Sequence, residues 1–403
     1  MIRSFVYKNW ISILWFLLTA ICIAHIPFSH SNNYLLFKYV FYHLRDLQNL
    51  YLEYPDSYYD SNHYGPAFAL VIAPFVIFPD EIALSLWVLA NSLILYFTIL
   101  QIPVENRARM FIILICAQEL MTSLRSSQFN PMMAALIVLT FCFIHKKKEY
   151  WAAFCIVLGT FVKLYGIVGL AFFFFVNDKK KFIIWLVLWS VILFVLPMAI
   201  STPKFVIESY MDWYHALVHK NDLNMVTMMQ DISVGGLIRK LFNYPELPTL
   251  WVLIPGMFVY SLSFLNIKYY QDLRFRLLIL ASTLLFPVLF SSGSESPTYI
   301  IAFVGVAIWF MVQEKPYSKT EWTLLIFAII LTSLSPSDLF PKYINRTYVQ
   351  PYHLKALPCF LIWFRIIYDT LTMYKYPVLN NSLEINSQGY TIHEASIKRD
   401  KTI

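Results

Sequence analysis

The chain has 403 residues, of which 59% are hydrophobic and only 14% are charged. Soluble domains carry about 25% charged residues, so this chain has too few polar side chains to cover a water-soluble body. The net charge of +7 does not indicate nucleic-acid binding, because the basic residues cluster between apolar segments and form no stripe. The composition predicts an all-α integral membrane protein built from spans of about 20 residues.

The first predicted span covers residues 9–27. Within it, residues 10–24 follow Arg3 and Lys8, so a signal peptide is one interpretation. No convincing small-x-small cleavage site follows it, and many further apolar segments do, which favours an uncleaved first helix. Single spans are predicted further along the chain at residues 80–102, 108–124, 131–145, 182–200, 250–266, 277–291, 298–313, 321–336 and 356–372.

Two segments do not fit as single crossings. Residues 151–176 are apolar but have lysine clusters on both flanks, at 146–148 and 179–181. Because lysine and arginine collect on the cytoplasmic side, we interpret this stretch as a helical hairpin with residues 163–166 at its outer tip. Residues 65–79 contain three prolines and are short for a span, which indicates a juxtamembrane helix in the outer leaflet. The total is about twelve transmembrane helices, including the hairpin.

The charge pattern also predicts the topology. Placing every basic cluster inside puts both termini in the cytoplasm and three regions outside, at residues 28–80, 201–249 and 335–355. We expect residues 1–372 to form a single polytopic domain and residues 373–403 a flexible cytoplasmic tail. The five cysteines all lie in apolar segments without metal-ligand spacing, so we expect no metal and no cofactor.

The first outward loop interleaves tyrosines with acids and amides, a mixture that suits a sugar with its apolar C–H patches and hydroxyl groups. The alternative is an interfacial aromatic belt, where tyrosine is enriched in any case. Asp46 lies closest to the first helix, but residue type alone does not separate it from Asp56 or Asp60, and it could be a solvated acid paired with Arg45. The candidate substrate-binding residues of this loop are Tyr51, Tyr58, His63 and Tyr64.

Lys163 is the most informative single residue, because a lysine inside an apolar run is costly and marks a functional-site hypothesis by default. Its natural partner is an anion such as a phosphate, and the alternative is snorkelling of the side chain to the interface. For Asn130 and Glu295, the alternative to a substrate-binding role is that each caps a helix. The candidate substrate-binding residues of the other outward turns and loops are Arg125, Gln128, Asn130, Asp231, Ser233 and Glu295.

Several motifs, in this order along residues 10–310, resemble the GT-C superfamily of membrane glycosyltransferases and, more narrowly, glycosyltransferase family 87, the polyprenyl-phosphate-mannose type of enzyme. They are Arg45-Asp46-Leu47 with Tyr51, His63-Tyr64-Gly65-Pro66, Ala73-Pro74-Phe75, Leu86-Trp87 with Asn91, Ser127-Gln128-Phe129-Asn130, Gly159-Thr160-Phe161-Val162-Lys163-Leu164-Tyr165, and Ser233 with Gly236-Leu237 and Arg239. The chain departs from the pattern at Gly65, at Asp231-Ile232-Ser233 and in the late turn Ser294-Glu295-Ser296-Pro297-Thr298-Tyr299.

The resemblance implies a GT-C-type fold and a polyprenyl-phosphate sugar donor. It implies that Asp46 is the general base for the acceptor hydroxyl and that Gln128 and Asn130 lie near the sugar pocket. From their charge we add Lys163 and Arg239 as candidate ligands of the donor phosphate. We therefore expect a hexosyltransferase that moves a sugar, mannose by the resemblance, to a lipid or glycan acceptor with inversion.

A transporter or flippase of lipid-linked sugars is the competing function, since it would use Lys163 on the same phosphate headgroup. The chain has only 10 glycines and no internal repeat, both of which favour the enzyme. A non-catalytic scaffold is a third alternative. The resemblance and the uncleaved first helix favour a bacterial inner membrane, and the endoplasmic reticulum is the alternative location. In the inner membrane the active site would face the periplasm, and membrane lipids would be its neighbours.

Overall fold

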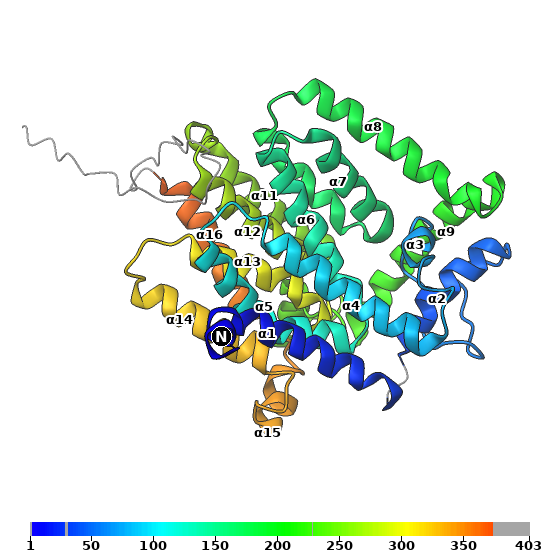
Figure 1. Cartoon of the computed structure of the whole chain (residues 1–403), viewed down its shortest axis with the longest axis horizontal. Helices are drawn as coiled ribbons and strands as arrows, with labels where there is room; N and C mark the ends of the chain where they lie inside the picture. The colour runs from blue at the N-terminus through cyan, green and yellow to red at the C-terminus, as the bar shows by residue number, and fades with distance from the viewer. Residues whose placement is uncertain (1, 29–30, 228, 374–403) are drawn as a thin grey trace, which may run out of the picture.

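The computed structural model describes residues 2–28, 31–227 and 229–373, and every secondary-structure element within them is helical (Figure 1). The all-α class is thereby confirmed. The first half contains α1 (Ile2–Ala24), η1 (Ile26–Phe28), α2 (Asn32–Arg45), α3 (Phe68–Ile72), α4 (Asp80–Ile99), α5 (Asn106–Arg125), α6 (Asn130–His145), α7 (Glu149–Lys163), η2 (Tyr165–Phe175), α8 (Lys179–Val195) and η3 (Leu196–Ala199).

The second half contains α9 (Pro203–Val226), α10 (Val234–Leu241), α11 (Thr249–Leu262), η4 (Ser263–Leu265), η5 (Ile267–Tyr269), α12 (Leu273–Phe290), η6 (Ser296–Thr298), α13 (Tyr299–Met311), α14 (Lys319–Phe327), η7 (Ala328–Leu334), α15 (Lys342–Ile344), η8 (Asn345–Val349) and α16 (Ala356–Leu371). Both η7 and η8 are π-helices. The predicted tail lies, except for Met373, outside the described residues.

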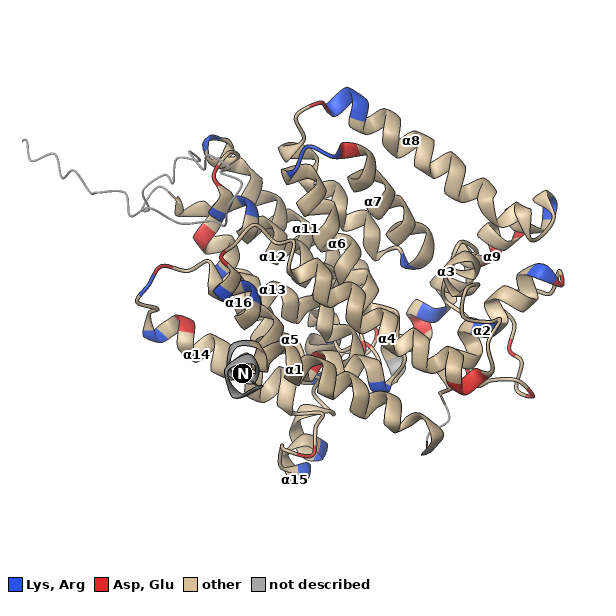
Figure 2. Ribbon diagram, viewed as in Figure 1, with Lys and Arg blue, Asp and Glu red and all other residues tan. Residues whose placement is uncertain are grey.

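Three described helical segments are long and apolar enough to cross a membrane, at Asp80–Ile99, Lys179–Ala199 and Leu273–Phe290, and five shorter apolar helices accompany them. Figure 2 shows the charged residues mainly at helix ends and in the connections, with long uncharged helical flanks between them. This distribution is typical of a membrane protein. The predicted number of about twelve crossings stays a prediction.

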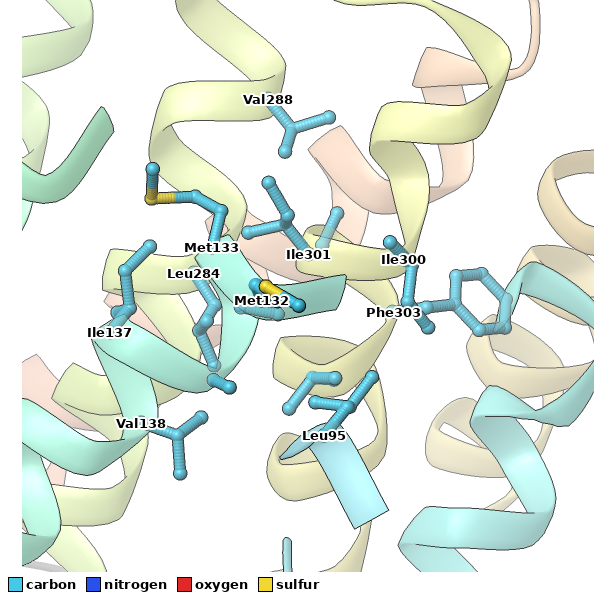
Figure 3. Packing of buried hydrophobic residues seen from close by; sticks show 14 of the residues in the cluster. Leu95, Met132, Met133, Ile137, Val138, Leu284, Val288, Ile300, Ile301 and Phe303 are labelled. Atoms are coloured by element: carbon cyan, nitrogen blue, oxygen red, sulfur yellow. The ribbon is translucent and has the colours of Figure 1, made fainter. Parts of the chain in front are cut away.

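The core lies between α12 and α13, which pack against each other and against α5, α6 and α16. Gly305 allows the close approach of α13 to α12, because a Cβ atom there would lie 2.6 Å from the Ala281 carbonyl oxygen. Side chains of α4, α6, α12 and α13 interdigitate around Met132 and Met133 (Figure 3). This packing brings the turn between α5 and α6 close to the turn between α12 and α13, where the polar candidates lie.

The chain turns where the hairpin was predicted. Helix α7 ends at Lys163, Leu164 has a positive φ of 25°, and η2 follows. The second arm is a 3₁₀ helix of 11 residues, longer than is common for this form. It runs close to α7 because Gly166 has no side chain: a Cβ atom there would lie 2.3 Å from the Thr160 backbone nitrogen. The hairpin tip thereby holds Lys163 at a fixed place.

The predicted first outward loop, residues 28–80, contains two helices, α2 and the short α3. The predicted juxtamembrane helix over 65–79 is limited to Phe68–Ile72, since its prolines remove backbone donors and interrupt the helix. Gly65 donates its backbone N–H to the Val162 carbonyl oxygen at 3.1 Å, and a Cβ atom on Gly65 would lie 2.1 Å from the Phe161 carbonyl oxygen. This contact brings residues 63–65 against the hairpin tip.

Candidate active site

A chain of hydrogen bonds links polar side chains from four separate parts of the sequence. Lys163 Nζ donates to Asn130 Oδ1 at 2.7 Å, and Asn130 Nδ2 donates to Gln128 Oε1. Gln128 Nε2 donates to Glu295 Oε2 at 2.7 Å, and Gln230 Nε2 donates to Glu295 Oε1 at 3.3 Å. We call these five residues the polar chain. It joins four of the predicted site residues, with a lysine at one end and a carboxylate near the other.

Lys163 sits among aromatic rings as well as amides. Its ammonium lies 5.2 Å from the centre of the Tyr165 ring and 5.8 Å from that of Tyr64. Ring faces attract cations, so these contacts stabilise a charge that the surrounding apolar helices disfavour. An ammonium group has three donors, and a single hydrogen bond to a described residue leaves capacity for an anionic ligand.

A cavity of about 450 Å³ opens beside the polar chain. This volume lies in the range of small-molecule sites, about 300–1,000 Å³. Most of the residues that line it have polar side chains, although apolar atoms make up most of the wall surface, and this mixture suits a sugar with its hydroxyl groups and C–H patches. The walls consist of Asn33, Thr122, Ser126, Gln128, Met229, Gln230, Ile232, Glu295, Ser296, Pro297, Ser335, Pro336, Asn345, Val349, Gln350, His353 and Lys355. Two predicted site residues, Gln128 and Glu295, are among them.

A buried ion pair that the sequence analysis did not select supports one wall. Lys355 Nζ lies 3.1 Å from Glu119 Oε1 and also donates to Ser296 Oγ at 2.9 Å. Its ammonium is 4.9 Å from the centre of the Tyr299 ring. The pair therefore fixes Ser296, the first residue of η6, directly before α13. Glu119 could have been found, because an acid inside a predicted apolar span is a functional-site hypothesis by default.

Asp231 and Arg239 form a second buried unit, and both side chains are 1% exposed. Arg239 Nη1 donates to Asp231 Oδ2, while Arg239 Nε donates to the Leu247 carbonyl oxygen at 2.9 Å. Ser233 Oγ donates to Asp231 Oδ1 at 2.7 Å, and this serine caps α10. The backbone of Asp231 pairs with that of Ser292 at 2.9 Å. These bonds hold Gln230 against Glu295.

Comparison with known proteins identifies the family of the chain. The family model of glycosyltransferase family 87 matches residues 62–292, more than half of the chain. The chain belongs to glycosyltransferase family 87. No curated protein matches it. The matched region includes Gln128, Asn130, Lys163 and Gln230, whereas Glu295 and Lys355 follow it along the chain. The resemblance to this family of glycosyltransferases is thus confirmed, and GT-C membership is consistent with it.

In this family 87 protein, Asp46 lies at the C-terminal end of α2 with its side chain 45% exposed. Arg45 binds both of its oxygens, from Nε at 2.7 Å and from Nη2 at 2.9 Å. The hydrogen bond from Arg45 lowers the pKa of the Asp46 carboxyl. Asp46 does not line the cavity. The structure thus contains the pairing with Arg45 that the sequence left open as an alternative.

The tyrosines of the first outward loop are packed in two places. Tyr58 is buried in an aromatic cluster with His43 and Tyr54. Tyr51 donates its hydroxyl to the Tyr64 carbonyl oxygen at 3.2 Å, and the centre of the Tyr64 ring lies 5.8 Å from Lys163 Nζ. The structure therefore brings Tyr64 to the polar chain and places Tyr58 in a separate packing cluster.

His63 and Arg125 lie at the margins of the candidate site. His63 Nε2 is 3.8 Å from Asp60 Oδ1, and burial lowers the pKa of this histidine although Asp60 opposes the shift. Lys220 of α9 binds the same carboxylate at 3.1 Å, so this group ties the first loop to α9. Arg125 is exposed at the end of α5, one residue before the cavity-lining Ser126.

Proposed function

We propose that this membrane glycosyltransferase moves a hexose from a polyprenyl-phosphate donor to a hydroxyl group of a lipid or glycan acceptor in the cavity beside the polar chain. The observation that carries the proposal is the polar chain itself, which connects Lys163 at one end to Glu295 in the wall of the cavity. A cation for the donor and a carboxylate facing the cavity are the two groups that such a transfer needs. Mannose is the sugar that the family resemblance suggests.

A lipid-linked donor fits the position of the cations. The ammonium of Lys163 lies at the tip of an apolar hairpin, where a phosphate on a polyprenyl chain would arrive from the membrane. Arg125, exposed beside the cavity wall, is a second cation for the same phosphate. Arg239 has its guanidinium engaged with Asp231 and Leu247, so we assign it a supporting role toward the donor site.

The proposed reaction is a single displacement with inversion at the anomeric carbon. A carboxylate accepts the proton of the acceptor hydroxyl as its oxygen attacks, and polyprenyl phosphate leaves with its charge met by the fixed cations. The resemblance assigns the proton transfer to Asp46. In that role Asp46 has to exchange its ion pair with Arg45 for the acceptor hydroxyl. General-base catalysis contributes about 10²–10⁴-fold.

A flippase of lipid-linked sugars is the alternative function, because the half-buried Lys163 would serve it equally well. The proposed enzyme acts at the outer face of a bacterial inner membrane, with both termini in the cytoplasm. A transport protein would move labelled lipid between leaflets without forming a new glycosidic bond. Product analysis therefore separates the two functions.

The test uses the purified full-length protein in lipid nanodiscs with radiolabelled polyprenyl-phosphate-mannose and a membrane lipid extract as acceptor. The proposal predicts transfer of the label to a new product. An Asp46→Asn variant tests the assignment from the resemblance, which predicts a loss of at least about 100-fold. Absence of transfer, with labelled donor moved between leaflets in proteoliposomes, would favour the flippase.

A further inference from the structure

We propose that α9 lies along the membrane surface and that one side of this helix contacts lipid. Four large apolar side chains of α9 are exposed, Ile207 by 47%, Met211 by 62%, Tyr214 by 65% and Val218 by 50%. They are spaced by four, three and four residues, and this spacing places them on the same side of a helix. We call these four residues the apolar stripe. Exposed apolar side chains that gather on one side of an element mark an interaction surface.

The other sides of α9 show which partner fits the stripe. Next to the stripe lie exposed polar side chains spaced by four and seven residues, at Lys204, Glu208, His215 and Asp222. A third side packs against the protein through the buried Val206 and Trp213. A helix with an exposed apolar side beside a charged side fits the boundary between acyl chains and headgroups, where lipid covers the first side and water the second.

The place of α9 in the chain also favours lipid as the partner. The preceding segment Lys179–Ala199 is apolar and long enough to cross a membrane, and α8 runs along the edge of the molecule (Figure 1). Residues 200–202 alone separate this segment from α9, too few to carry α9 away from the surface where the span ends. Five charged residues among the 24 positions of α9 disfavour a second crossing. We therefore expect α9 to lie along the membrane.

The same helix holds the first outward loop. Trp213 Nε1 donates to the His63 carbonyl oxygen at 2.9 Å, and Asn49 Nδ2 donates to Asp212 Oδ2 at 2.9 Å. These bonds attach the loop to α9 at two points, and Asp46 lies three positions before the first of them. In the proposed transferase, the contact of α9 with lipid would hold this loop at the depth of the donor phosphate; this part of the inference rests on the proposed function.

The experiment measures the surroundings of two side chains of α9 in the full-length protein in lipid nanodiscs. Met211→Cys and His215→Cys each receive a nitroxide spin label, and wild type taken through the same labelling is the background control, since its five cysteines are buried. Collisions with oxygen report lipid, and collisions with a water-soluble nickel complex report water. The ratio of oxygen to nickel collisions is expected to be several-fold higher at position 211 than at position 215.

A second set of variants tests the link between the stripe and the donor site. Ile207→Asp combined with Met211→Asp places two acids on the apolar stripe, and His215→Asp combined with His219→Asp places two acids at exposed positions outside it. The stripe pair is expected to raise the KM for polyprenyl-phosphate-mannose by about 5-fold, because charges are unfavourable on a surface that faces lipid. The control pair should leave this KM near the wild-type value.

Three results would overturn the inference. Nickel collisions that are equally frequent at both positions would place the stripe in water. A label at position 211 that is shielded from both reagents would mean that protein, such as a second copy of this chain, covers the stripe. Equal donor KM values for the two acid pairs would remove the link to the donor site. The collision measurement needs no turnover, so an inactive wild type would contradict the proposed function and leave the contact of α9 with lipid to be decided by the spin labels.

Discussion

Gln128 and Glu295 are 167 positions apart in the sequence, yet the Gln128 side-chain amide donates a hydrogen bond to the Glu295 carboxylate at 2.7 Å. This bond joins the turn between α5 and α6 to the turn between α12 and α13. It also links the part of the chain that carries the family signature to a residue just beyond it. The carboxylate that faces the cavity is therefore held by a residue of the family core.

Gln128→Leu removes the donor to Glu295 and the acceptor for Asn130 together. A hydrogen bond to a charged group contributes about 1.5–3 kcal/mol, so kcat is expected to fall by about 10-fold to 100-fold. Gln350→Leu is the matched control, because Gln350 lines the same cavity and lies outside the polar chain. Steady-state transfer assays on both variants check this. Equal activity of the two variants would contradict a role for the polar chain.

Lys163→Met removes the cation proposed to bind the donor phosphate. The KM for the polyprenyl-phosphate donor is expected to rise by about 10-fold or more, because charge-assisted hydrogen bonds contribute about 1.5–3 kcal/mol. The KM for the acceptor should change little. Lys181→Met, at a side chain that is 73% exposed on α8, is the control for loss of a lysine. An unchanged donor KM in Lys163→Met would remove Lys163 from the donor site.

Lys355→Met leaves the Glu119 carboxylate buried without its cation. Breaking one side of a buried pair costs about 3–5 kcal/mol, so the free energy of unfolding should fall by that amount. The double variant Glu119→Leu with Lys355→Met should recover much of the loss, since an apolar pair avoids the buried charge. Denaturation in detergent, arranged as a double-mutant cycle, measures this. Additive losses would show that the two residues do not interact.

Gly166→Ala tests the close packing of the hairpin. The new methyl group would lie 2.3 Å from the Thr160 nitrogen, so the two arms must separate, at a cost of about 1–3 kcal/mol. Gly293→Ala is the control, because its nearest neighbouring atom is 3.5 Å away and ordinary contact results. Thermal unfolding should therefore separate the two variants, with Gly166→Ala the less stable. Equal stability would mean that the hairpin tip tolerates a side chain.

Much of the fold could be predicted from the sequence. Composition predicted a helical membrane protein, and the lysine clusters at 146–148 and 179–181 located a turn at Lys163 that the structure contains. The form of the second arm could not be predicted, because it depends on how closely Gly166 approaches α7. Apolar patterns alone do not separate a 3₁₀ helix from an α-helix.

Part of the candidate site could also be predicted from the sequence. Lys163 could be selected because it lies inside an apolar run, and Gln128, Asn130 and Glu295 because they lie in polar turns between predicted helices. Their connection into one chain depends on packing between distant turns, which the sequence does not give. Lys355 was missed because it lies at the boundary between a polar loop and an apolar helix, where a lysine is common and does not indicate a site. The sequence left the pairing of Asp46 with Arg45 as an alternative, and only the structure shows this pair and the two glutamines that bind Glu295.

The most direct test of the central claim is to fill the cavity and measure sugar transfer. Asn345 lines it from η8, away from the polar chain, so Asn345→Trp should block the acceptor while leaving the polar chain in place. With radiolabelled polyprenyl-phosphate-mannose in nanodiscs, we expect the wild type to form a new glycoside and Asn345→Trp to bind donor without forming it. Transfer by Asn345→Trp at the wild-type rate would contradict the claim that this cavity is the site of transfer.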